Sequence, residues 1–172
     1  MTPDDAAVPI GGLSDGPIDG RADFHAAVRR VLVDAARRGA RTLVACDADF
    51  AGWPLDDARV LDALTRWAAP GRRLTLFALH YDVFVGLHPR WTAWRRIWSH
   101  RVDTRAATEA GELPTLLLAI GDGHTCTLRL PDAKRWRGTL SLRAEDATRA
   151  RDQIDAISQR SVPAFAPTTL GL

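Results

Sequence analysis

The chain has 172 residues, of which 46% are hydrophobic and 26% are charged, and its formal net charge is +2. This length is typical of one domain with its own core, and so small a net charge argues against a dedicated nucleic-acid coat. No apolar run approaches the length of about 18 residues that would span a membrane, and residues 1–20 lack the basic and apolar regions of a signal peptide, so we expect a cytoplasmic protein.

Residues 1–20 are acidic and rich in glycine and proline, which predicts a flexible N-terminal arm. Residues 21–172 are expected to form a single α/β domain. Its first half contains two segments with helical spacing of apolar residues, each followed by a short apolar run that is typical of a buried strand. The helices are expected over residues 21–39 and 56–68, and the strands over 42–46 and 74–79. A strand, a helix and a strand at this spacing predict parallel pairing.

The second half begins with a third helix, whose main segment starts at Pro89 and runs to Trp98. The tripeptide Gly121-Asp122-Gly123 predicts a tight turn between two antiparallel strands. The remaining elements are a short strand over 101–105, the hairpin strands over 113–120 and 124–130, a short run over 139–142 and a last helix over 145–160. We therefore expect a mixed, mainly parallel sheet flanked by helices.

Polar side chains follow both buried strands of the first half. Asp47 and Asp49 come after the first strand, and His80 and Asp82 come after the second. Because ligands in open α/β sheets bind beyond the carboxyl ends of the strands, these four residues are expected to form a polar pocket.

Paired carboxylates at such a position would suit a metal-dependent phosphohydrolase in which Asp47 and Asp49 hold Mg²⁺. The Asp-x-Asp pattern resembles that of haloacid-dehalogenase-like phosphatases, but Phe50-Ala51 stands where that family carries Gly-Thr or a close equivalent. The simpler interpretation, which we favour, is that one of these aspartates caps a turn.

A segment over residues 88–101 combines tryptophan with arginine. Trp91, Trp94 and Trp98 lie at i, i+3 and i+7, on one face of a helix, and Arg95 is among the arginines beside them. This combination would stack on bases, contact an anionic surface or form a subunit interface. Alternatively, the tryptophans cover the sheet and the arginines are solvated. With a net charge of +2, any nucleic-acid binding is expected to be weak.

Other catalytic motifs are absent from the sequence. Cys46 and Cys126 lie in apolar stretches, which predicts buried thiols without a disulfide. His124 and Cys126 share a strand face but lack two further ligands for zinc. There is no Gly-rich phosphate loop and no Gly-x-Ser-x-Gly nucleophile motif, so we expect neither a cofactor nor a resident metal.

Two segments resemble one half of the phospholipase D superfamily: residues 70–82 (PGRRLTLFALHYD) and residues 113–123 (LPTLLLAIGDG). The second corresponds to the family strand that carries His-x-Lys-x-x-x-x-Asp-Gly. Aligning its Asp-Gly with Asp122-Gly123 places Thr115 at the nucleophilic histidine and Leu117 at the phosphate-binding lysine. Neither side chain can perform these roles, so the resemblance implies an inactive phospholipase-D-like domain that acts as a binding or assembly module.

The same resemblance implies a homodimer, because enzymes of that family unite two halves across a pseudo-two-fold axis and single-half members pair. A lone half would also leave an apolar face open to water. The face that carries Trp91, Trp94 and Trp98 is the most suitable cover. It would lie either at the two-fold interface or folded back over the sheet within one chain.

Overall fold

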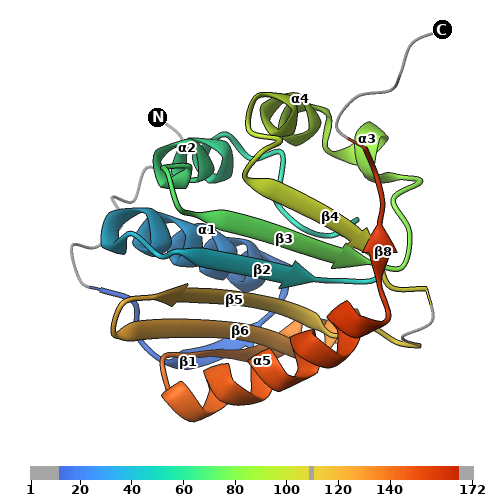
Figure 1. Ribbon diagram of the computed structural model, residues 1–172. Coiled ribbons are helices and arrows are strands. Elements are labelled where there is room, and N and C mark those ends of the chain that lie inside the picture. The colour runs from blue at the N-terminus through green and yellow to red at the C-terminus, as the bar shows by residue number, and fades with distance from the viewer. Residues whose placement is uncertain (1–11, 109–110, 167–172) are drawn as a thin grey trace, which may run out of the picture.

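A mixed sheet of eight strands forms the centre of the structure, a computed structural model that describes residues 12–108 and 111–166. The strands follow the order β1-β7-β6-β5-β2-β3-β4-β8 (Figure 1). They are β1 (Gly16–Asp19), β2 (Thr42–Cys46), β3 (Arg73–Ala78), β4 (Val102–Ala106), β5 (Thr115–Gly121), β6 (His124–Asp132), β7 (Arg137–Ser141) and β8 (Val162–Pro163). The helices are α1 (Arg21–Arg38), α2 (Ala58–Trp67), α3 (Phe84–Leu87), α4 (Pro89–Ile97) and α5 (Ala144–Gln159), with a 3₁₀ turn, η1 (Ala133–Arg135).

The strands β2, β3 and β4 form the parallel part of the sheet, which confirms the predicted pairing of the first two buried strands. A helix precedes each of these three strands and returns the chain to the same edge of the sheet. The helix α1 ends at Gly39, whose φ of 69° lies in the left-handed region that glycine adopts without steric cost. The strands β2, β3 and β4 therefore all begin at one edge, which we call the amino edge, and end at the opposite, carboxyl edge.

The expectation of a mainly parallel sheet is wrong, although the mixed α/β architecture is confirmed. Five of the seven strand pairings among the described residues are antiparallel. The described residues between β4 and β5 contain no helix, so the chain enters β5 from the carboxyl edge and runs back against β2. Short turns then connect β5, β6 and β7, and such turns impose antiparallel pairing.

The strand β1 corrects the expected extent of the N-terminal arm. Residues 16–19 belong to the arm predicted over residues 1–20, but they pair with Arg137–Leu140 of β7. The side chain of Ile18 is only 3% exposed and joins the main core. Residues 1–11 of the expected arm lie outside the described residues.

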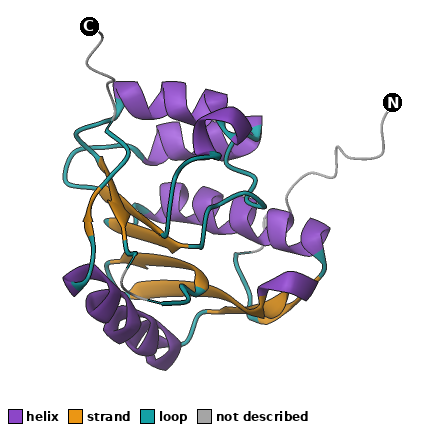
Figure 2. Ribbon diagram, turned by 90° about the vertical axis from the view of Figure 1, so that its right-hand side faces the viewer, coloured by secondary structure: helices purple, strands orange, loops and turns teal. Residues whose placement is uncertain are grey.

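The two faces of the sheet are covered by different helices (Figure 2). The helices α1, α2 and α4 pack on one face and enclose the main core. The helix α5 packs on the other face, where its apolar stripe meets β2, β3 and β5 in a second, smaller core. None of the helices within the described residues combines the length and the apolar composition needed to cross a lipid bilayer.

Candidate functional site

The four residues of the expected polar pocket lie at the carboxyl edge, as predicted, but they do not line one cavity. A cleft of about 630 Å³ opens there between the end of β2 and the start of β5, and Asp47 is among its lining residues. Asp49, His80 and Asp82 are not part of this lining. The imidazole Nδ1 of His80 lies 3.7 Å from a carboxylate oxygen of Asp82, and both side chains are at least half exposed.

Hydrogen bonds to backbone and hydroxyl groups engage both carboxylate oxygens of Asp47. One oxygen accepts from the backbone N–H groups of Asp49 and Phe50, at 3.2 and 3.0 Å. The other accepts from the hydroxyl of Thr115 at 2.7 Å. The carboxylate of Asp49 accepts from the Ala51 N–H at 2.9 Å. These are the contacts of aspartates that cap a turn, the simpler of the two interpretations.

The cleft at the carboxyl edge mixes both signs of charge. Arg129 donates to the side-chain oxygen of Gln153 at 3.0 Å, and Lys134, the single lysine of the chain, lies at the rim. The acidic residues of the lining are Asp47, Glu112 and Asp132. Among the described residues, no group of three or more His, Cys, Asp and Glu side chains is placed to hold a metal ion. The cleft therefore selects neither an anion nor a cation by charge.

The three positions of the degenerate phospholipase D motif are separated in the structure. Thr115 begins the seven-residue strand β5 and Asp122 follows its last residue, so the two lie roughly 20 Å apart. Leu117 is 2% exposed and belongs to the main core. Asp122 lies exposed in the hairpin turn and forms an ion pair with Arg41 at 2.9 Å. These three side chains do not assemble into one reactive site.

The two cysteines are free and buried, which confirms the prediction of buried thiols. Burial raises the pKa of both thiols to about 12. A thiol with such a pKa is protonated at neutral pH, and the protonated form is a poor nucleophile. Neither Cys46 nor Cys126 is therefore placed for nucleophilic chemistry.

The tryptophans of the segment over residues 88–101 pack within the chain. Trp91 is fully buried, with its ring 5.0 Å from that of Phe84, and Trp94 is 7% exposed and donates to the Thr65 hydroxyl. Trp98 is half-buried and packs against the main core. Trp91 and Trp94 thus pack as expected for tryptophans that cover the sheet. Their burial leaves little surface for stacking on bases or for a subunit interface.

Arg95 is buried rather than solvated, contrary to the expectation for the arginines of this segment. It is 4% exposed and donates to the hydroxyl of Thr104 at 2.6 Å and to the carbonyl of Phe165. Its guanidinium lies 4.8 Å from the centre of the Phe165 ring. Arg95 thus fastens the residues that follow α5 and has no free surface for a ligand.

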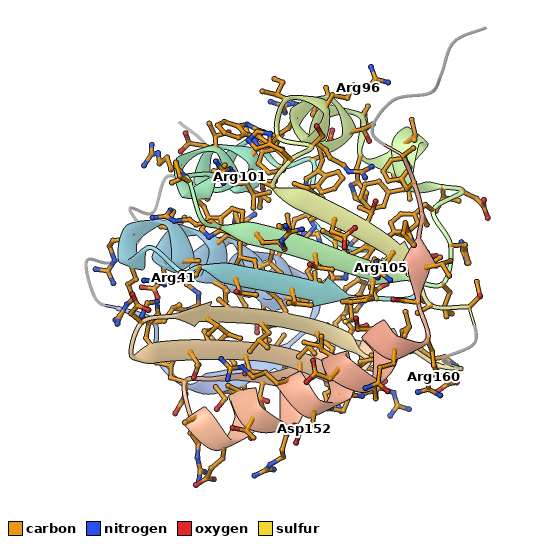
Figure 3. All side chains as sticks on the ribbon, in the orientation of Figure 1. Arg41, Arg96, Arg101, Arg105, Asp152 and Arg160 are labelled. Atoms are coloured by element: carbon orange, nitrogen blue, oxygen red, sulfur yellow. The ribbon has the colours of Figure 1, made fainter. Side chains whose placement is uncertain are left out.

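The amino edge carries an arginine cluster that sequence reasoning missed. Arg41, Arg73 and Arg101 stand at the starts of β2, β3 and β4. The Arg73 N–H donates to the carbonyl of Arg41, and the Leu74 N–H donates to the carbonyl of Arg101, each at 2.9 Å. The three residues therefore lie close together where adjacent strands begin, with Arg73 level with Thr42, one residue after Arg41. Figure 3 shows Arg41 and Arg101 at this edge and Arg105 at the opposite end of β4.

Arginines that precede these three residues in the chain extend the same surface. Arg37 and Arg38 occupy the last turn of α1, and Arg66 occupies the last turn of α2. Arg72 donates to the carbonyl of Trp67 at 2.7 Å, and its guanidinium lies beside Gly39 at the end of α1. We call the following seven residues the arginine edge: Arg37, Arg38, Arg41, Arg66, Arg72, Arg73 and Arg101.

The arginine edge retains a surplus of positive charge. Three carboxylates pair with four of its members: Asp34 with Arg37 and Arg38, Asp62 with Arg66, and Asp122 with Arg41. Within the part of the chain that the structure describes, Arg72, Arg73 and Arg101 form no ion pair. A group of seven guanidinium groups with only three carboxylates attracts anions. The guanidinium groups that remain exposed are available to bind such an anion.

The signal for this surface was present in the sequence as three short segments that each end just inside a strand: RRGART, PGRRL and SHRV. The surface was missed because the net charge of +2 is a sum over the whole chain, in which carboxylates elsewhere, including those of the carboxyl edge, offset these arginines. Only the parallel arrangement of β2, β3 and β4 brings the three segments together.

Comparison with known proteins gives a likeness at the level of the fold. No protein-family model matches the sequence, and neither does any curated protein. Among solved structures, the chain is similar to TrmBL2, an archaeal chromatin protein described as having a novel mode of DNA binding, with a TM-score of 0.55 and 14% sequence identity. The match covers 93% of this chain and 56% of the TrmBL2 chain, so it spans little more than half of that protein.

Proposed function

We propose that the protein is a non-catalytic binding module that associates with nucleic acid through the arginine edge. The observation that carries this proposal is the grouping of Arg41, Arg73 and Arg101 at the starts of three adjacent strands. Neighbouring strands lie about 4.8 Å apart, so the three arginines leave the sheet within roughly 10 Å of one another. Arg73 is level with Thr42, so the side chain of Arg41 projects from the opposite face of the sheet. A phosphate backbone presents anionic groups at a comparable density.

The helix dipole explains only part of the arginine edge. Arginines in the last turn of a helix interact favourably with the negative end of the dipole, which gives Arg37, Arg38 and Arg66 a structural role. Arg73 is the first residue of a strand, and Arg101 lies beyond the end of α4. Their charges have no such role and no ion-pair partner among the described residues. Planar guanidinium groups match the geometry of phosphate oxygens, which favours a phosphate-bearing partner.

The absence of catalysis is supported by the groups at the carboxyl edge. The Thr115 hydroxyl and the Asp47 carboxylate are bonded to each other, and the carboxylate also caps a turn. This engagement disfavours the metal-dependent phosphohydrolase that uses Asp47 and Asp49. The resemblance to an inactive half of the phospholipase D superfamily remains part of the proposal, and it points the same way.

The likeness to TrmBL2 supports nucleic acid as the partner, since that protein is described as binding DNA. The homodimer implied by the phospholipase D resemblance stays a prediction. Trp91 and Trp94 do not supply its interface, because both are buried within the chain. The arginine edge also replaces the Trp/Arg segment as the surface for an anionic partner.

Matched charge variants test this proposal. The double variant Arg73→Gln/Arg101→Gln removes two unpaired guanidinium groups from the arginine edge. The control Arg135→Gln/Arg160→Gln removes the same charge from residues outside that edge; Figure 3 shows Arg160 beyond the end of α5. Fluorescence anisotropy with labelled DNA in about 50 mM salt is expected to show affinity at least about tenfold lower for the edge variant, and within about twofold of the wild type for the control.

Equal loss of affinity in both variants would show that net charge, rather than the arginine edge, governs binding. Absence of binding by the wild type would overturn the proposal. Both variants must melt at the wild-type temperature, so that a loss of binding is not a loss of fold. The DNA recovered from each mixture is expected at full length, and cleavage by the wild type would contradict the non-catalytic role.

A further inference from the structure

A groove of about 470 Å³ lies beside the arginine edge, between α1, the β5–β6 hairpin and the start of α5. The hydrogen bonds and ion pairs of the arginine edge leave this groove open. Its apolar walls include Leu13, Ile120 and Leu142, and Leu142 is 37% exposed. We call it the hairpin groove. Apolar walls of this kind suit an uncharged, hydrophobic group of a ligand.

Two glycines of the hairpin turn, Gly121 and Gly123, line the groove. The imidazole of His124 lies against Gly121, where a Cβ atom would come within 2.2 Å of the ring. Gly123 has a φ of 71°, a conformation that side chains other than glycine rarely adopt. The turn therefore presents backbone and the imidazole of His124 to the groove.

One polar atom in the groove lacks a partner. The Nδ1 atom of His124 lies 3.2 Å from the carbonyl of Asp122, whereas Nε2 is buried and makes no hydrogen bond within the described residues. A ligand reaches Nε2 only when the imidazole turns away from Gly121, and a bond formed then recovers the free energy that the unpaired atom costs. The Nε2 atom can donate or accept, depending on the tautomer of the ring.

Charged groups stand on both sides of the groove. Arg38 and Asp34 both line the α1 side, and the Asp34 carboxylate pairs with Arg38 and with Arg37. Arg151 lies on the α5 side and forms no ion pair within the described part of the chain. Two guanidinium groups beside an apolar floor fit a ligand that carries a planar ring and a phosphate.

We propose that the hairpin groove receives an unpaired nucleobase of a single strand whose phosphates follow the arginine edge. This inference rests on the proposed function and names its substrate class. The apolar walls hold the faces of the base, and Arg38 and Arg151 contact the flanking phosphates. The imidazole of His124 turns away from Gly121 to bond to the edge of the base. In a duplex the base is paired and stacked, and extruding it costs free energy. The protein is therefore expected to prefer single strands.

Two groove variants and one control test the inference with a labelled 20-nucleotide DNA strand and the corresponding duplex. The variants His124→Ala and Leu142→Ser leave the charge of the arginine edge intact. The control Val85→Ser alters an apolar side chain of α3 that is 49% exposed. Each groove variant is expected to lower the single-strand affinity about tenfold, as lost contacts to a base do, while duplex affinity stays within about twofold.

The outcomes separate this inference from the proposed function. Equal wild-type affinity for both probes, or equal weakening of both by the groove variants, would overturn the hairpin groove as a base site. The proposed function would stand in that case, provided the Arg73→Gln/Arg101→Gln variant weakens binding to both probes. Binding of neither probe would overturn both. A groove variant that melts early is replaced by the other, because the two alter different elements.

Discussion

At the residue scale, Asp47 and Thr115 form a hydrogen bond with each other instead of the reactive sites that the sequence suggested for each of them. Both were singled out from the sequence, Asp47 as a metal ligand and Thr115 as the residue at a nucleophile position. The structure joins them at 2.7 Å across the ends of β2 and β5. The pairing could not be predicted, because it depends on β5 running antiparallel to β2.

Two threonine-to-valine variants test the structural role of this bond. Thr115→Val removes the donor to a carboxylate, and hydrogen bonds to charged groups are worth about 1.5–3 kcal/mol when buried. Because Asp47 is partly exposed and keeps two backbone donors, we expect the free energy of unfolding to fall by about 1–2 kcal/mol in urea titration.

The matched control is Thr127→Val in β6. The Thr127 hydroxyl is buried and has no hydrogen-bond partner within the described residues. Removing it is therefore expected to leave the stability unchanged or to raise it slightly. Equal destabilisation by the two substitutions would show that the bond between Thr115 and Asp47 contributes nothing specific.

At the scale of elements, the residues after α5 form a strap that closes the free edge of β4. The strand β8 pairs with Arg105 and Ala106, and the Ala164 N–H donates to the carbonyl of Thr104. The ring of Phe165 stacks on Tyr81, with centroids 5.2 Å apart, and covers the guanidinium of Arg95. The strap thus covers an edge strand that would otherwise expose unpaired backbone groups.

Hydrogen exchange of the Phe165→Ala variant measures how firmly this strap is held. Loss of the ring contacts with Tyr81 and Arg95 is expected to speed exchange of the Ala164 amide at least about tenfold, as local opening becomes easier. Amides of β2 and β5 in the centre of the sheet are expected to keep their rates. The control is Val162→Ala, since Val162 belongs to the same strap and is 61% exposed. Unchanged exchange at Ala164 in Phe165→Ala would refute the role of the ring.

The elements recovered from the sequence are those with a strong local signal. Helical spacing predicted α1, α2, α4 and α5, and apolar runs predicted β2, β3 and β5, with bounds within two residues of those observed. The strands β1 and β8 were missed because four and two residues are too short for a periodic pattern. The antiparallel pairing of β5 with β6, predicted from the turn at Gly121-Asp122-Gly123, is confirmed. The antiparallel pairing of β5 with β2 was not predicted, because direction follows from the path of the connection rather than from composition.

The distribution of charge over the whole molecule explains why the small net charge does not indicate an anion-binding surface. The arginines gather where β2, β3 and β4 begin, whereas Asp47, Asp49 and Asp82 follow β2 and β3 at the other edge. The net charge of +2 is the sum over the whole chain and describes neither edge. Binding to a polyanion depends on the local group of charges that it meets.

The salt dependence of DNA binding tests this account most directly, because it counts the phosphates that the protein neutralises. If the arginine edge meets about five phosphates of a single strand, the logarithm of the association constant falls against the logarithm of salt concentration with a slope of about −3.5. Arg73→Gln/Arg101→Gln is expected to make the slope shallower by about 1.4, and Arg135→Gln/Arg160→Gln to leave it unchanged. A wild-type slope near zero, or the same slope in both double variants, would contradict binding through the arginine edge.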